Sequence, residues 1–177
     1  MSDKSGQATA LTAFNRLESG REDVERYLRD LPRGSESPLA RLPRLHFARW
    51  VVIDRLPGDP PEPDVLDQPY LVFTACVDGD TRAFARELGE QLRPELDSIW
   101  GSCVGYPGAG DAAAFANWLL EHHVPTSFFV AAYGKATVQD VHNSLAAREQ
   151  VLGFALRAQS LEPAGRLDAF KAAFPAS

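Results

Sequence analysis

The residues of this chain best suited to chemistry are a histidine and an arginine inside one apolar run, Leu45 to Asp54. His46 could serve as an acid, a base or a metal ligand, because imidazole titrates near neutral pH. Arg49 could bind a substrate carboxylate through two parallel hydrogen bonds. It could instead form a buried ion pair with Asp54 or Asp78, and a buried run of this kind favours the ion pair.

A set of aromatic residues could complete a pocket around these two side chains. Strand alternation is expected to place His46 and Trp50 on one face of the run. In the alternative interpretation, His46 makes a local hydrogen bond and Trp50 fills the core. The residues predicted to line a ligand pocket are His46, Arg49, Trp50, Trp100, Tyr106 and Tyr133.

Three aspartates and a glycine-containing segment have simpler structural interpretations than binding sites. The spacing of Asp78, Asp80 and Asp111 matches no calcium loop, and these residues are expected at strand ends and helix starts, where carboxylates cap helices. The glycines of residues 105–110 lack the lysine and the spacing of a phosphate loop. The sequence therefore predicts no metal site and no nucleotide site.

The remaining histidine pair and the cysteines also lack catalytic spacing. His122 and His123 are adjacent, so they point about 100° apart on a helix and are expected to interact with its C-terminus. Cys76 and Cys103 form no CxxC pattern and are expected to be small buried residues. No nucleophile motif of a known hydrolase is present.

Composition sets the class of protein. The chain has 177 residues, a net charge of −6 and 45% hydrophobic residues, which suffices for a packed core. An acidic balance argues against nucleic acid and anionic membrane surfaces as partners. With no membrane-length apolar run and no signal peptide, the expected location is the cytoplasm.

The elements that would position these residues follow from periodicity. Residues 8–31 are predicted to be helical with a break near Gly20, and residues 56–69 to be a proline-rich loop. Pro163 is expected to start a final helix. The predicted strands are 44–54, 70–78, 98–106 and 126–133, and the predicted helices between them are 82–93, 112–122 and 137–160, the last with Val141, Leu145, Leu152 and Leu156 inward.

This order predicts an α+β fold, a ferredoxin-like sandwich. Its sheet would have about four mainly antiparallel strands with helices on one face. The expected organisation is a helical extension and linker at 1–40, a core domain at 41–160 and a C-terminal helix at 161–177. The second face of the sheet would then need a cover: terminal helices, another subunit or a ligand.

Several short motifs resemble a poorly characterised bacterial family. They are the segment 46–50 (HFARW), Asp78-Gly79, Ile99-Trp100, Val104-Gly105-Tyr106-Pro107, and Ala132-Tyr133 followed by Thr137 to Val141. The resemblance covers roughly residues 42–156, and the chain departs from it at Gly134, where a proline often follows the tyrosine. It implies an α+β domain of the ferredoxin-like, dimeric-barrel type, sometimes associated with haem peroxidase-type proteins.

Two functions are consistent with these observations. The first is an interaction or assembly module without a cofactor, which associates with itself or with a larger protein. The alternative is a small-molecule or haem-binding oxidoreductase-type enzyme that uses a pocket on the open sheet face. Since each candidate motif has a simple structural interpretation, the sequence favours the interaction module.

Overall fold

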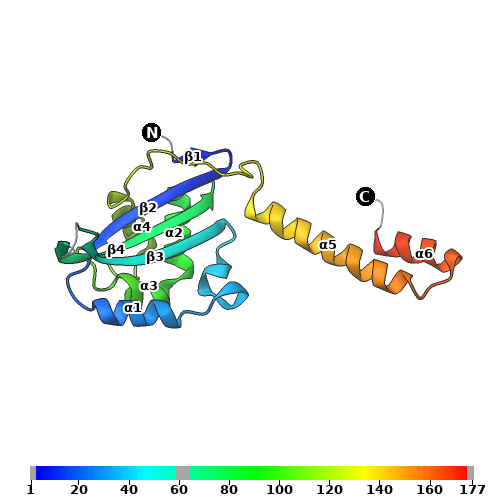
Figure 1. Cartoon of the computed structure of the whole chain (residues 1–177), viewed down its shortest axis with the longest axis horizontal. Coiled ribbons are helices and arrows are strands. Elements are labelled where there is room, and N and C mark those ends of the chain that lie inside the picture. The colour runs from blue at the N-terminus through cyan, green and yellow to red at the C-terminus, as the bar shows by residue number, and fades with distance from the viewer. Residues whose placement is uncertain (1–2, 59–63, 175–177) are drawn as a thin grey trace. The chain divides into compact units, whose positions relative to one another are not determined.

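The computed structural model describes residues 3–58 and 64–174 (Figure 1). The chain divides into two compact units, Met1–Val138 and Gln139–Ser177. The first unit contains the sheet and four of its helices, and the second contains most of a long helix and a short one. Together these elements make the α+β class that the sequence predicts.

The sheet has four antiparallel strands in the order β1-β2-β4-β3. The strands are β1 (Lys4–Ser5), β2 (Ala8–Arg16), β3 (Leu45–Leu56) and β4 (Asp64–Asp78). The strands predicted at 44–54 and 70–78 are therefore present and longer than expected. Because β4 pairs with β2 on one side and β3 on the other, it is the central strand.

The helix predicted from residue 8 is wrong in its first half, because residues 8–16 form β2. Leu11, Ala13 and Leu17 alternate inward with a period of two, which a helical interpretation of Leu11, Phe14 and Leu17 overlooks. The second half does form a helix, α1 (Arg21–Asp30), which starts after Gly20. Two short 3-10 turns, η1 (Gly34–Glu36) and η2 (Pro38–Arg41), lead from α1 toward β3.

The proline-rich loop is shorter than predicted, because β4 already begins at Asp64. Pro69 lies within β4, where the pairing with β3 shifts register between Ile53 and Arg55. A proline fits there because an interrupted ladder needs no backbone donor at that position. The predicted loop residues 59–63 lie outside the described part of the chain.

Two predicted strands are absent from the described structure. Residues 93–100 form a helix, α3 (Arg93–Trp100), and the predicted strand 98–106 is otherwise a series of turns. Pro94 takes an early position in α3, where its missing N–H costs nothing. Residues 126–133 run without regular structure beside β1.

The first three helices after β4 pack on one face of the sheet (Figure 1). They are α2 (Thr81–Gln91), α3 and α4 (Ala112–Glu121), and the predicted caps Asp80 and Asp111 accept backbone hydrogen bonds at the starts of α2 and α4. Their apolar side chains meet those of β2 and β4. The largest fully buried residues are Trp100, Phe73, Phe84 and Phe115.

The second unit consists of most of α5 (Val138–Ala158) and of α6 (Pro163–Ala173). The sequence predicts both helices, but it places the long one in the core domain 41–160. The expected inward stripe of α5 is wrong, since Val141, Leu145, Leu152 and Leu156 are all exposed. Their spacing marks an apolar side of a helix, but periodicity cannot say whether that side is covered.

Candidate functional site

The face of the sheet opposite α2, α3 and α4, here called the open sheet face, is the candidate site. Alternation along each strand and the pairing register define three rows across it. The rows are Ala10–Cys76–Phe47, Thr12–Thr74–Arg49 and Phe14–Val72–Val51. Two apolar rows thus enclose one polar row.

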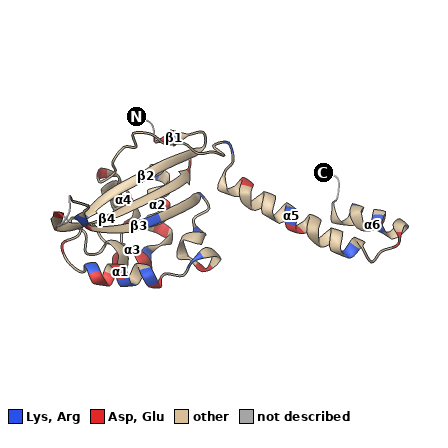
Figure 2. Ribbon diagram, viewed as in Figure 1, with Lys and Arg blue, Asp and Glu red and all other residues tan. Residues whose placement is uncertain are grey.

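Large apolar side chains on this face remain accessible. Phe47 is 57% exposed, Val51 42% and Phe14 39%. The strands that carry them have few charged residues, whereas the surrounding helices have many (Figure 2). An apolar surface of this kind, bounded by polar residues, is typical of a contact site.

His46 does not share a face with Trp50, contrary to the alternation argument. A register irregularity between Leu45 and Phe47 breaks the alternation, and the His46 side chain meets Asp78 at the end of the open sheet face. His46 Nε2 donates to Asp78 Oδ1 at 2.8 Å. The other Asp78 oxygen accepts the backbone N–H of Val138, the first residue of α5, at 2.7 Å. Asp78 therefore connects β4, β3 and the start of α5.

Arg49 is exposed in the polar row rather than buried in an ion pair. Its Nε donates to Thr74 Oγ1 at 3.0 Å across the two strands. Asp54 instead pairs with Arg21 and Arg55, which hold the pKa of this carboxyl below its usual value. Arg49 is thus a cation available on the open sheet face.

The aromatic candidates do not gather around His46. Trp50 and Trp100 pack in the core with ring centroids 5.7 Å apart, and both rings contact Phe73, the cross-strand partner of Trp50. The Tyr106 hydroxyl donates a hydrogen bond to Asp97 Oδ1 at 2.9 Å. Burial raises the pKa of Tyr106 most, and the Asp97 carboxylate raises it further. These rings stabilise the domain from the helix side.

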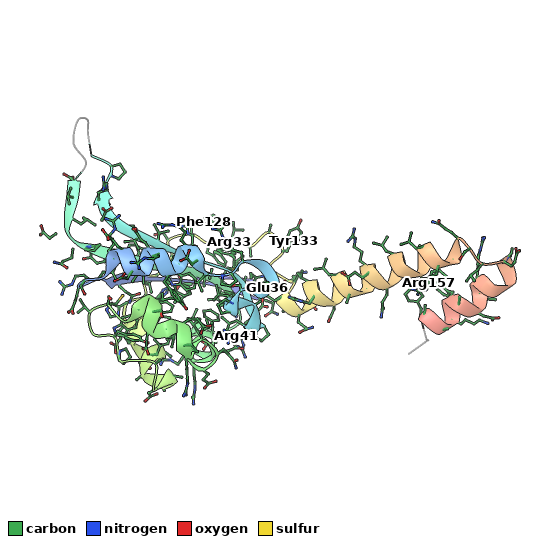
Figure 3. The ribbon with its side chains drawn as sticks, turned by 90° about the horizontal axis from the view of Figure 1, so that it is seen from below. Arg33, Glu36, Arg41, Phe128, Tyr133 and Arg157 are labelled. Carbon is green, nitrogen blue, oxygen red and sulfur yellow. The ribbon has the colours of Figure 1, made fainter. Side chains whose placement is uncertain are left out.

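Tyr133 lies on the irregular segment before α5, far in sequence from the other candidates. The segment is held to the edge of the sheet by hydrogen bonds: Thr126 N–H donates to Asp3, Ala131 N–H to Ser5, and Gln7 N–H to Gly134. In Figure 3, Phe128 and Tyr133 lie on the side of the sheet away from the green helices. Phe128 is 82% exposed and Tyr133 86%, so the segment adds apolar surface.

Two cavities lie elsewhere. One of about 510 Å³ is bounded by α1, the 3-10 turns and α3, and contains Tyr27, Arg41 and Glu95. Another, of about 290 Å³, lies beside Arg16 and Tyr70. Neither of these two cavities is lined by any of the six predicted pocket residues. Glu36 and Arg41, labelled in Figure 3, also line the first cavity.

The histidines and cysteines take structural places. His122 ends α4, with its Nδ1 2.8 Å from the Trp118 carbonyl oxygen, and His123 Nδ1 accepts the Thr12 N–H at 3.2 Å. Cys76 and Cys103 are buried, and burial raises the pKa of the Cys103 thiol to about 12. A thiol with so high a pKa is a poor nucleophile at neutral pH.

Within residues 3–58 and 64–174, no group of three or more His, Cys, Asp or Glu side chains could hold a metal ion. In the same part of the chain, no helix combines the length and apolar character needed to cross a membrane. In comparisons with known proteins, no family model, curated sequence or solved structure matches this chain.

The residues that define the open sheet face were only partly visible in the sequence. Phe14 falls within the predicted helix 8–31, and Arg49, on the same strand face as Phe47 and Val51, is expected in a buried ion pair. The alternation of Thr9 to Leu17 was the available signal for β2. The contact of Asp78 with Val138 joins residues 60 positions apart, and no local pattern indicates it.

Proposed function

We propose that this chain is an assembly module that associates with a second copy of itself through the open sheet face. The observation that carries the proposal is the exposed apolar surface of Phe47, Val51 and Phe14 on a sheet whose other face is already covered. In this interpretation the domain is a two-layer, ferredoxin-like sandwich of one sheet and one layer of helices, and the sheet face without helices is the interface. Burying such a surface in a dimer is favourable by about 25 cal/mol per Å² of apolar area.

The rows favour one arrangement of the two sheets. With a two-fold axis along β4, strand β3 of one copy lies over β2 of the other, and the rows stay in register. Phe47 then faces Ala10, a large side chain over a small one, and Val51 faces Phe14. Packing of large against small residues is what close-packed interfaces require.

The position of Arg49 supports this axis over the alternative. An axis perpendicular to the strands would place the two Arg49 side chains against each other, and like charges across an interface are costly. With the axis along β4, Arg49 faces Thr12 of the second copy. The residue nearest the axis in the polar row is then Thr74.

Opposite charges at Thr74 test the arrangement. We expect sedimentation equilibrium of the full chain to give twice the 19.4 kDa monomer mass. Thr74→Arg and Thr74→Asp should each weaken dimerisation at least about tenfold, because each places like charges on the axis. An equimolar mixture of the two variants should form a heterodimer.

Val65→Arg provides the control, since Val65 is 75% exposed at the far end of β4, outside the three rows. It should dimerise like the parent chain. Circular dichroism of each variant establishes that it is folded. A parent chain that stays monomeric at high concentration would overturn the proposal, and so would Thr74 variants that dimerise normally on their own.

The enzyme alternative has less support from the geometry. Its six pocket residues are divided between the core, the open sheet face and the segment before α5. The His46 imidazole, partly exposed beside Asp78, is the group on which a haem-binding role would depend. Titration with haemin tests it: a Soret band that His46→Ala removes would favour the enzyme over the assembly module.

A further inference from the structure

The described part of the second unit, residues 139–174, contains no buried residue. Helix α6 returns beside α5 through one cluster of rings, with Phe154 5.6 Å from Phe170 and 5.8 Å from Phe174 between centroids. This cluster uses one side of α5 only. A two-helix hairpin with so little buried surface needs further contacts to be stable.

The other side of α5 carries an apolar stripe, defined by Val141, Leu145, Leu152 and Leu156. These residues recur at intervals of four, seven and four positions, which keeps them on one side of a helix. By the same spacing Phe154 points to the opposite side. The stripe is therefore a separate contact surface.

We propose that the α5 stripe pairs with the α5 stripe of a second copy, parallel and in register. This inference rests on the proposed self-association and names a second contact for it. In such a pair each stripe residue meets its own copy, so Leu145 packs on Leu145 and Leu152 on Leu152. The contact is self-complementary, as a two-fold dimer requires.

The two charges in the middle of the stripe select the parallel orientation. Arg148 and Glu149 occupy the seven-residue interval, and adjacent helical residues point about 100° apart, so they flank the stripe on opposite sides. In a parallel pair, the Arg148 side of one helix faces the Glu149 side of the other, at both rims. In an antiparallel pair, Arg148 would face Arg148 and Glu149 would face Glu149.

The parallel pair also strengthens the first contact. Each α5 begins at Val138, the last residue of the first unit, whose N–H donates to Asp78. Pairing of the helices raises the effective concentration of one open sheet face near the other. Two contacts of modest area can then form a stable dimer together.

One cysteine added to the full chain at a time, beside the buried Cys76 and Cys103, tests the orientation of the α5 pair. Under mild oxidation, Leu145→Cys alone and Leu152→Cys alone should each form a covalent dimer, with the linked peptides identified by mass spectrometry. Asn143→Cys, exposed on the opposite side of α5, is the matched control and should form none. Linkage only between Leu145→Cys and Leu152→Cys in a mixture would indicate an antiparallel pair and overturn the proposal.

Charge exchange gives an independent readout. Arg148→Glu and Glu149→Arg should each weaken dimerisation about tenfold, because like charges then meet at both rims, and the double exchange should restore it. Equal affinity for all three variants would overturn the proposal. Helix content is compared first, so that an unfolded α5 is not mistaken for a lost contact.

The two contacts fail in distinguishable ways. Dimers that depend on Thr74 but give no α5 linkage would leave the proposed function intact and refute the α5 pairing. Linkage at Leu145 and Leu152 in a chain whose dimerisation is unaffected by the Thr74 substitutions would support the α5 pairing and refute the proposed function. A monomeric chain would refute both.

Discussion

At the scale of single residues, Gly6 combines a left-handed backbone with the closest approach that an added Cβ would make among the described glycines. It has a φ of +65°, and an added Cβ would lie 2.0 Å from the carbonyl oxygen of Gly134. The turn between β1 and β2 therefore has both a conformation and a close approach that only glycine allows. This approach brings the segment before α5 against the sheet.

We expect Gly6→Ala to destabilise the domain by more than the roughly 1 kcal/mol that left-handed backbone alone costs an L-residue. Gly108→Ala is the matched control, because Gly108 has a φ of +87° with nothing within 4 Å of an added Cβ. Chemical denaturation measures both variants. Equal losses would mean that the Gly134 contact contributes nothing.

The raised pKa of the buried Cys103 thiol leads us to expect a loss of stability at alkaline pH. Its folded-state pKa of about 12 lies above the usual value of 9.0 because the thiol is buried. Between pH 9 and pH 12 the thiol is protonated in the folded chain and increasingly ionised in the unfolded chain. The free energy of unfolding is therefore unaffected by this group below pH 9 and falls as the pH rises toward 12. The decline from this group is up to about 1.4 kcal/mol per pH unit.

Denaturation curves between pH 8 and pH 11 measure this decline, and Cys103→Ala should make it shallower. Tyr106→Phe removes another group whose pKa is raised, chiefly by burial, and should act in the same direction. A Cys103→Ala chain with an unchanged pH profile would contradict the prediction.

At the scale of elements, the last residue of β4 connects two other segments. Asp78 accepts from His46 of β3 and from the first N–H of α5. A carboxylate at a helix N-terminus also interacts favourably with the helix dipole. The start of α5 is thus fixed by a residue of the sheet.

Asp78→Ala should fray the first turn of α5, because the Val138 N–H loses its acceptor. Amide hydrogen exchange should be faster at residues 138–141 and unchanged in α4. His46→Ala is the comparison, since it removes the other contact of Asp78 and leaves the Val138 acceptor in place. Equal exchange in both variants would argue against the cap.

Elements were predictable where their signals are local. The caps Asp80 and Asp111 identified the starts of α2 and α4, and the apolar run 70–78 identified the central strand. Strand β2, which lies between β1 and β4, was missed because Leu11, Phe14 and Leu17 also fit a helical period. The last residues of α3 were mistaken for the start of the strand 98–106, because Ile99 and Trp100 are apolar in either element.

The candidate site was less predictable than the fold for a physical reason. Which face of β3 is covered depends on one irregularity beside His46, and an extra residue moves every later side chain to the other face. Because of this irregularity, the prediction that His46 and Trp50 share a face was wrong. Exposure of the α5 stripe depends on the rest of the molecule, which a pattern of 21 residues does not contain.

At the scale of the whole molecule, the core is complete without the second unit. Its packed cluster extends from Leu11 to Leu119 along the described chain. No described residue after position 120 is buried. The proposed association through the second unit is therefore separable from the folding of the first.

A chain ending at Val138 should unfold cooperatively, with a denaturation midpoint close to that of the full chain under monomeric conditions. It should also dimerise more weakly, because the α5 contact is gone. Denaturation followed by fluorescence of the buried tryptophans measures the first property and sedimentation the second. A truncated chain that is unfolded would show that α5 contributes to the core.

The order of these parts along the chain has a consequence for synthesis. The last residue of the core cluster, Leu119, is translated well before the α5 stripe is finished. Domains that are complete early generally fold as units while the chain is still growing. The sheet and its helices can therefore form while the end of the chain is still being added, and in the proposed dimer each copy would fold before its complete α5 stripe could pair.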